Sequence, residues 1–217
     1  QGAGMKNDAM KKNIVIIAAA AVVVCTVIFG VFKFVNADDA PGGGSASNTG
    51  EGLRDGAHIL LNEGWAIDLP GSERPAGDQN AVMSINGVDV SNGFYQYKLG
   101  LMTSVGSDDP EAATLDLLKK YVVQWQFADE NGILPDEKEI ADAVRANRDP
   151  IDEDEAAHDA MVSFLNGAEL TEHEYWDIIQ TEYEAPYALL NEMIAAYCSE
   201  NDVSAPQWDD AEVVFNK

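Results

Sequence analysis

The sequence predicts a mostly α-helical domain with a small β-hairpin or short sheet, preceded by one transmembrane helix. Residues 14–32 form an uninterrupted run of 19 uncharged, mostly apolar residues. Asn86 and Gly87 lie between short apolar stretches, a pattern typical of a tight hairpin turn. Between residues 91 and 197, apolar side chains recur at helical spacing behind residues that favour helix starts.

The apolar run is long enough to cross a membrane. At about 1.5 Å per residue, 19 residues span about one hydrocarbon core. Lys6, Lys11 and Lys12 precede the run, so the basic end is expected to stay in the cytoplasm and the C-terminal bulk to lie outside. A cleaved signal peptide is the alternative, with a small-residue cleavage site at residues 35–37. The run exceeds the apolar length of an ordinary signal, which favours the anchor.

The chain divides by composition into six parts. Residues 1–4 precede Met5, the first plausible initiator, and are excluded from the fold prediction. Residues 36–52 are rich in glycine and serine and are predicted to be a flexible linker. The remaining segments are a basic cytoplasmic end (5–13), the anchor (14–35), an irregular packed segment without a long element (53–80) and the folded domain (81–217).

The charge is strongly acidic. The chain carries 38 acidic and 13 basic side chains, a net charge of −25. Residues 1–33 hold only one of the acids and four of the bases, so the remainder carries −28. Such a surface repels phosphate backbones and anionic headgroups, which argues against nucleic-acid binding. Its two interpretations are solubility through repulsion and attraction of basic partners.

Start and stop signals define the elements of the domain. Residues 81–90 are expected to form a strand, a turn and a second strand, and Ser91 to cap the helix that follows. A helix starting at Asp109-Pro110 is expected to end at Asn131-Gly132. Further helices are expected from Pro135 to about Asn147, from about Glu153 to Asn166, and from the capping pair Thr171 and Glu174, with a kink or division at Pro186. Residues 211–215 are short enough for an edge strand.

No set of residues predicts catalysis, a metal or a cofactor. Cys25 lies in the apolar run and Cys198 near the C-terminus, so they are not expected to pair, and Cys25 lacks the small neighbours of a lipoprotein signal. His173 lacks the second histidine that a zinc helix needs. The acidic run 152–155 lacks the glycine of a calcium loop and is interpreted as charge at a helix N-terminus.

Aromatic side chains are abundant in the helical part. Adjacent pairs such as Tyr175-Trp176 are not expected to face one core together, so some rings could line an apolar groove for polypeptides. The other interpretation is that the rings fill a small core and its rim. The predicted peptide-binding residues are Phe94, Tyr97, Leu101, Trp125, Tyr175, Trp176, Tyr183 and Tyr187.

Three segments together resemble the N-terminal domain of SurA-type periplasmic chaperones and PrsA-type extracytoplasmic foldases. The first contains the strand-turn-helix residues Ile85, Asn86, Gly87, Val90, Ser91, Phe94, Tyr97 and Leu101. The second contains a helix end and an acidic helix start, at Ala128, Gly132, Ile133, Asp136, Glu137 and Ile140. The third precedes the long last helix, with Gly167, Leu170, Thr171, Glu172, Glu174 and Tyr175.

The resemblance implies a SurA-N-like fold and chaperone-like binding of unfolded or newly exported polypeptides. It covers residues 81–197. Only about twenty residues follow Tyr197 in this sequence, so the parvulin isomerase module of that family is not expected in it. His58-Ile59-Leu60 is similar to a parvulin motif but stands before the chaperone-like region. The expected function is therefore binding without isomerase activity, and the expected partners are polypeptides and, through the anchor, the membrane. A docking module for one envelope partner is the alternative, and an accessory subunit of a separate enzyme is the third.

Overall fold

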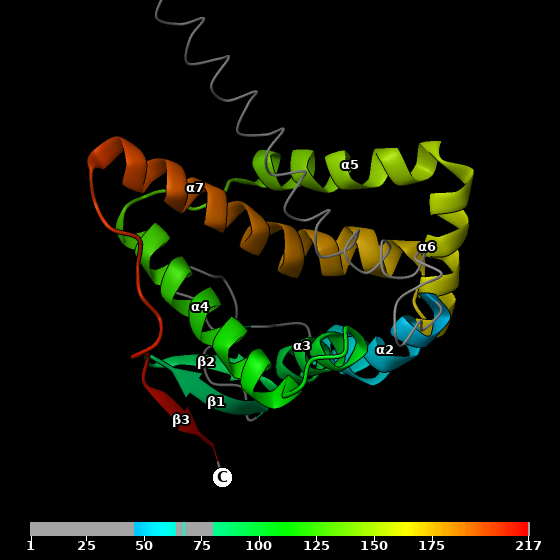
Figure 1. Cartoon of the computed structure of the whole chain (residues 1–217), viewed down its shortest axis with the longest axis horizontal. Coiled ribbons are helices and arrows are strands. Elements are labelled where there is room, and N and C mark those ends of the chain that lie inside the picture. Colours follow the sequence, from blue (N-terminus) through cyan, green and yellow to red (C-terminus); the bar gives the residue numbers. More distant parts are fainter. Residues whose placement is uncertain (1–45, 64–66, 68–79, 217) are drawn as a thin grey trace, which may run out of the picture.

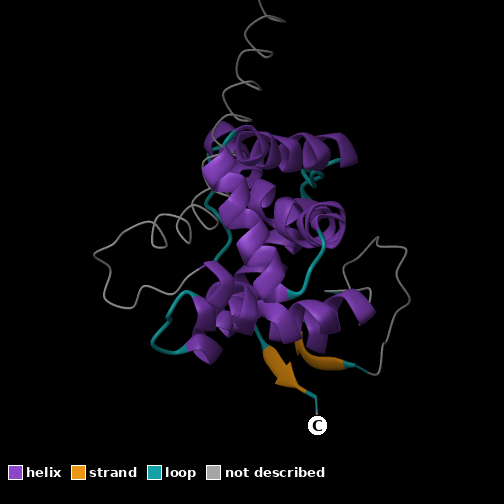
Figure 2. Ribbon diagram, turned by 90° about the vertical axis from the view of Figure 1, so that its right-hand side faces the viewer, coloured by secondary structure: helices purple, strands orange, loops and turns teal. Residues whose placement is uncertain are grey.

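The computed structural model describes residues 46–63, residue 67 and residues 80–216. The predicted cytoplasmic end, the anchor and most of the predicted linker lie outside these residues. No helix in the described part has the length and apolar character needed to cross a bilayer. What is described is mostly helical with a small antiparallel sheet, as the sequence predicts (Figures 1 and 2).

Helix α2 corrects the prediction for the segment before the hairpin. It runs Ala46–Glu63, so it includes the end of the predicted linker and much of the segment for which no long element was expected. Leu53, Ala57 and Leu60 recur at helical spacing and are buried, which gives the helix an apolar stripe facing the core. Tertiary packing therefore overrides the low helix propensity of its glycines.

Those glycines let α2 approach its neighbours closely. A Cβ on Gly56 would lie 2.5 Å from backbone atoms of Gln96 and Tyr97, and one on Gly100 would lie 2.6 Å from the Gly52 carbonyl oxygen. Two residues before Gly52, a Cβ on Gly50 would lie 2.1 Å from the Phe164 carbonyl oxygen. Helix α2 thus packs backbone to backbone against both α3 and α6, and its glycines are a packing device (Figure 1).

The hairpin forms where Asn86-Gly87 predicts it. Strands β1 (Ala81–Ile85) and β2 (Val88–Ser91) pair antiparallel, and both turn residues have positive φ, 49° for Asn86 and 79° for Gly87. The C-terminal strand β3 (Val213–Phe215) pairs antiparallel with β1, giving the order β2-β1-β3. The predicted edge strand is therefore confirmed. The outer side of β2 carries a bridge from Val90 to Ile67.

The first two helices of the domain start and stop at their predicted signals. Helix α3 spans Asn92–Ser104, and the Phe94 backbone N–H donates to the Ser91 hydroxyl at 3.1 Å. Helix α4 spans Pro110–Glu130, where Ala112 N–H donates to the Asp109 carboxylate at 3.1 Å. Gly132, with φ 65°, provides the expected left-handed residue just beyond its end.

Helices α5 and α6 divide the acidic run between them. Helix α5 spans Glu137–Glu153, passing the predicted end at Asn147, and Asp136 with Glu139 forms a capping box at its start. Helix α6 spans Glu155–Ala168, and Asp154 accepts hydrogen bonds from the two backbone N–H groups of Ala156 and Ala157. The helix-start interpretation thus holds for Asp154 and Glu155, whereas residues 152 and 153 end α5.

The last helical stretch is divided near Pro186, as predicted. Its first part, η1 (Glu174–Glu184), is a π-helix, and α7 (Ala185–Asn201) follows with Pro186 in its first turn. Proline is tolerated there because the first-turn N–H groups of a helix have no intrahelical partner. Helices α2, α5 and α7 all contact η1, so more than one of its faces is enclosed.

We predict that Gly56→Ala destabilises the domain by about 1–3 kcal/mol, the typical cost of overpacking against atoms that cannot move aside. The added methyl would meet backbone atoms of α3. Asp55→Ala is the control, because this neighbouring side chain is exposed. Urea unfolding followed by circular dichroism measures both. Equal stability of the two variants would contradict the packing role of Gly56.

We predict that Glu174→Gln removes a pH-dependent contribution to stability. The backbone N–H and hydroxyl of Thr171 donate to the Glu174 carboxylate at 2.8 and 2.7 Å, and these bonds lower its pKa below the ordinary 4.5. The contribution is therefore complete above the unfolded-state pKa and is lost as pH falls through the lowered folded-state value. The wild type should exceed the variant by about 0.5 kcal/mol at about pH 7 and by less at about pH 3. A gap independent of pH would contradict this.

Candidate functional site

Five of the eight predicted peptide-binding residues lie in the core. Phe94, Tyr97, Tyr175, Trp176 and Tyr183 are each at most 4% exposed, so in this structure they do not line an open surface groove. Tyr175 and Trp176 are both buried, with ring centroids 5.0 Å apart, contrary to the expectation for adjacent aromatic residues. The enclosure of η1 on several sides explains this, because residues on different faces of that helix are covered.

The other three predicted residues are half-buried. Leu101 lies on α3, Trp125 on α4 and Tyr187 on α7. The Tyr121 ring stacks on Tyr187 at 4.3 Å and on Trp125 at 6.3 Å between centroids, so the stack joins α4 to α7. These rings pack against the core and leave only part of their surface open. Of the eight residues predicted to line a groove, Leu101, Trp125 and Tyr187 are therefore the three with part of their side chains at the surface.

The buried aromatic residues surround an ion pair that sequence reasoning missed. Lys98 Nζ lies 2.6 Å from the Glu184 carboxylate, and the two side chains are 2% and 17% exposed. The same ammonium lies 5.2 Å from the Phe94 ring centroid and 5.4 Å from that of Tyr97. A buried charge is expensive unless it is paired, and here both the carboxylate and the rings compensate it. The signal in the sequence is that Lys98 lies four residues after Phe94, on the apolar side of α3.

The tyrosines near this pair are neutral phenols. Burial raises the pKa of Tyr97 well above the usual range, and the Glu184 carboxylate raises it further. Burial, followed by Glu184, also raises the pKa of Tyr175 and of Tyr187. Glu184 is the last residue of η1, and the carbonyl oxygen of the preceding Tyr183 accepts a hydrogen bond from the Tyr121 hydroxyl at 3.4 Å. The arrangement therefore fixes the junction between η1 and α7.

The acidic and histidine clusters have local partners. His173 Nδ1 lies 2.7 Å from the Asp177 carboxylate, one turn along the same helix. Asp152 pairs with Arg148 at 3.1 Å. In the described ranges, no three or more His, Cys, Asp or Glu side chains are grouped so that they could hold a metal ion.

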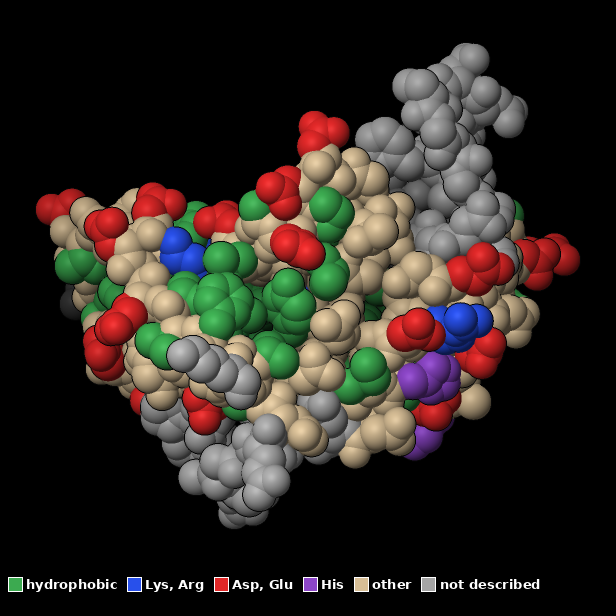
Figure 3. Space-filling model, turned by 90° about the horizontal axis from the view of Figure 1, so that it is seen from below, with side chains coloured by type: hydrophobic (Ala, Val, Ile, Leu, Met, Phe, Trp, Pro, Cys, Tyr) green, Lys and Arg blue, Asp and Glu red, His purple; other side chains and the backbone are tan. Residues whose placement is uncertain are grey.

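A different region presents apolar side chains at the surface. We define the C-terminal strap as residues 202–216, which leave α7, run along α4 and end in β3 (Figure 1). Val214 and Phe215, at 50% and 61% exposure, are two of the most exposed large apolar residues in the described part. Figure 3 shows apolar side chains gathered on the face that carries the sheet, with acidic side chains around them.

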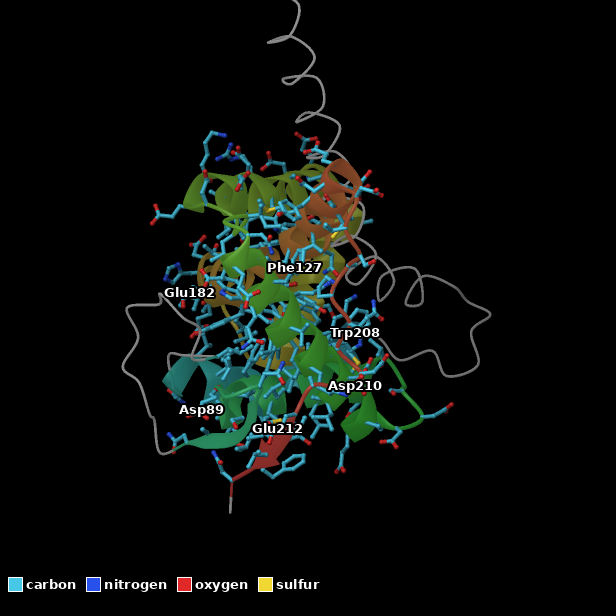
Figure 4. All side chains as sticks on the ribbon, turned by 90° about the vertical axis from the view of Figure 1, so that its left-hand side faces the viewer. Asp89, Phe127, Glu182, Trp208, Asp210 and Glu212 are labelled. Atoms are coloured by element: carbon cyan, nitrogen blue, oxygen red, sulfur yellow. The ribbon has the colours of Figure 1, made fainter. Side chains whose placement is uncertain are left out.

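The C-terminal strap is held by contacts with α4 and with the sheet. Lys119 Nζ donates to the Asp209 carbonyl oxygen at 2.5 Å, and Lys120 Nζ lies 5.2 Å from the Trp208 ring centroid. Nearer the sheet, Asn86 N–H donates to the Glu212 carbonyl oxygen and Glu212 N–H donates to the Asn86 side chain, both at 2.9 Å. Figure 4 shows Trp208, Asp210 and Glu212 along this path, with Asp89 at the sheet. None of the fifteen strap residues is buried.

We predict that Lys98→Met alone costs about 3 kcal/mol of stability, because it leaves the Glu184 carboxylate desolvated and unpaired. The double variant Lys98→Met/Glu184→Leu should cost less than Lys98→Met, since both charges are then removed. Urea unfolding of the wild type, both single variants and the double variant measures this coupling. A double variant that loses at least the sum of the single losses would contradict the pairing.

The candidate site is therefore the edge of the sheet with the C-terminal strap laid on it. The sequence predicted the edge strand but not its exposed apolar residues as a site. Searches against protein-family models, curated proteins and solved structures found no match for this chain.

Proposed function

We propose that this chain binds extended apolar segments of other polypeptides at the edge of its sheet, as a chaperone-like module without isomerase activity. The observation that carries the proposal is the exposure of Val214 and Phe215 on an edge strand. Within the described residues, the outer side of β3 has no pairing strand. Exposed backbone groups beside apolar side chains are the elements with which sheet edges recognise extended peptides.

The order of the elements supports a SurA-N-like fold as part of this proposal. The three resembling segments coincide with the hairpin and capped α3, with the end of α4 and capped start of α5, and with the Thr171–Glu174 capping pair at the start of the last helical stretch. The proposed position is on the outer side of a membrane, tethered by residues 14–35. The support for that position is the apolar run and the three lysines before it.

Charge indicates which polypeptides would bind. Residues 34–217 carry a net charge of −28, so basic segments are attracted and acidic ones repelled. Burial of partner apolar surface would contribute about 25 cal/mol per Å², less the cost of ordering the segment. Because five of the eight predicted peptide-binding residues are buried, the binding surface suits one short segment. That restriction favours the alternative function, docking of one dedicated envelope partner.

We predict that the full chain in phosphatidylcholine nanodiscs suppresses aggregation of reduced lysozyme more strongly than that of reduced α-lactalbumin. The two test proteins share a fold, but the first is basic and the second acidic. Added salt should weaken the difference, because the charges on both partners are exposed. Light scattering at near-stoichiometric ratio measures the effect, with empty nanodiscs as the control.

The proposal fails if neither protein is protected by a molar excess of the chain. Recovery of one folded membrane partner, without any protection of reduced lysozyme, would support the docking alternative instead.

A further inference from the structure

Strand β3 is short, and each of its residues is at least partly exposed. The C-terminal strap contains four acidic residues and no lysine or arginine, at positions 202, 209, 210 and 212. It therefore adds negative charge to a domain that is already strongly acidic, although Lys119 and Lys120 of α4 contact it at residues 208 and 209. All of its residues are at least partly exposed, and Ala211 and Val213 pack against the core with part of their side chains.

The register defines which backbone groups of β3 face β1. Asn86 N–H bonds the Glu212 carbonyl oxygen, and Asn216 N–H bonds the Val82 carbonyl oxygen, both at 2.9 Å. In an antiparallel pair, hydrogen-bonded positions alternate, so Ser84 and Val214 between them also exchange backbone bonds. The N–H groups of Val213 and Phe215 therefore point away from β1.

The side chains of β3 alternate between the two faces of the sheet. Val213 and Phe215 stand opposite Ile85 and Met83, whose side chains are buried on the core face of the sheet. The strand thus places apolar residues at alternate positions beside the core. It pairs with three of the five residues of β1, Met83 to Ile85, and a longer segment could pair with more of that strand.

We propose that β3 occupies, on the edge of β1, the place of a partner strand, and that an extended basic segment with alternating apolar residues displaces it. This inference rests on the proposed function and specifies which edge of the sheet the partner uses: the edge of β1 after β3 has left, in place of the outer side of β3. The partner is basic because the domain against which it would lie carries a strong net negative charge. Its apolar residues would take the positions of Val213 and Phe215, and its backbone would take the hydrogen bonds of Val214.

The test compares two proline variants of the full chain in phosphatidylcholine nanodiscs. Val214→Pro removes an N–H that faces β1, whereas Val213→Pro removes one that faces away. The probe is a fluorescent peptide of alternating lysine and valine, and a glutamate–valine peptide is the charge control. Val214→Pro should raise the affinity for the probe by about fivefold or more, as expected for the loss of one competing backbone hydrogen bond. Val213→Pro keeps the backbone bonds to β1 and should raise the affinity by much less than Val214→Pro.

A second variant, ending after Asp202, removes nearly the whole strap and should bind the probe at least as tightly as Val214→Pro. Circular dichroism checks that each variant is folded. Equal or weaker probe binding by Val214→Pro and by the shortened chain would overturn the displacement. Loss of binding in Val213→Pro alone would overturn it too, by placing the partner on the outer side of β3. If neither the wild type nor any folded variant binds the probe, the proposed function fails as well.

Discussion

The buried pair of Lys98 and Glu184 is the interaction on which the arrangement of this domain depends. It joins the middle of α3 to the junction of η1 and α7, segments 86 residues apart in sequence. A lysine buried this deeply is stable only when a carboxylate is fixed beside it and the neighbouring side chains favour its charge. Phe94 and Tyr97 place their rings beside the Lys98 ammonium, which explains why these rings face inward.

Two backbone features make the enclosure of this pair possible. The π-helical form of η1 brings Trp176, Ile179 and Tyr183 into the core and ends at Glu184 itself. π-Helical segments are rare and occur frequently at functional sites. The glycines of α2 provide the second feature, since they let that helix cover α3 at backbone distance. Both features lower the local stability of their helices and allow closer packing between helices.

Sequence reasoning succeeded where a local signal determines the structure. The hairpin at Asn86-Gly87, the caps at Ser91, Asp109 and Asp136, and the division near Pro186 all follow from the chemistry of a few adjacent residues. Helix α2 was missed because its glycines resemble a linker until their neighbours from α3 and α6 are known. The prediction that adjacent Tyr175 and Trp176 cannot share the core was wrong because it assumed a helix covered on one side only.

The candidate site shows the same division between local and long-range information. Residues 211–215 were recognisable as a short strand from their composition. Their position beside β1, and the exposure of Val214 and Phe215 there, depend on the path of the C-terminal strap along α4. Five of the aromatic residues predicted to form a binding surface are core residues. The prediction failed there because composition alone does not show which rings pack around a buried charge.

The central functional claim is that the C-terminal strap gives way to a partner strand at the edge of β1. Residue-resolved hydrogen exchange on the full chain, with and without the lysine–valine peptide, tests it most directly. The claim predicts that peptide binding accelerates exchange of the Val214 amide while the Ser84 amide stays protected, because the peptide takes over its hydrogen bond. Increased protection of Val214 on binding would show that β3 remains in place and would contradict the claim.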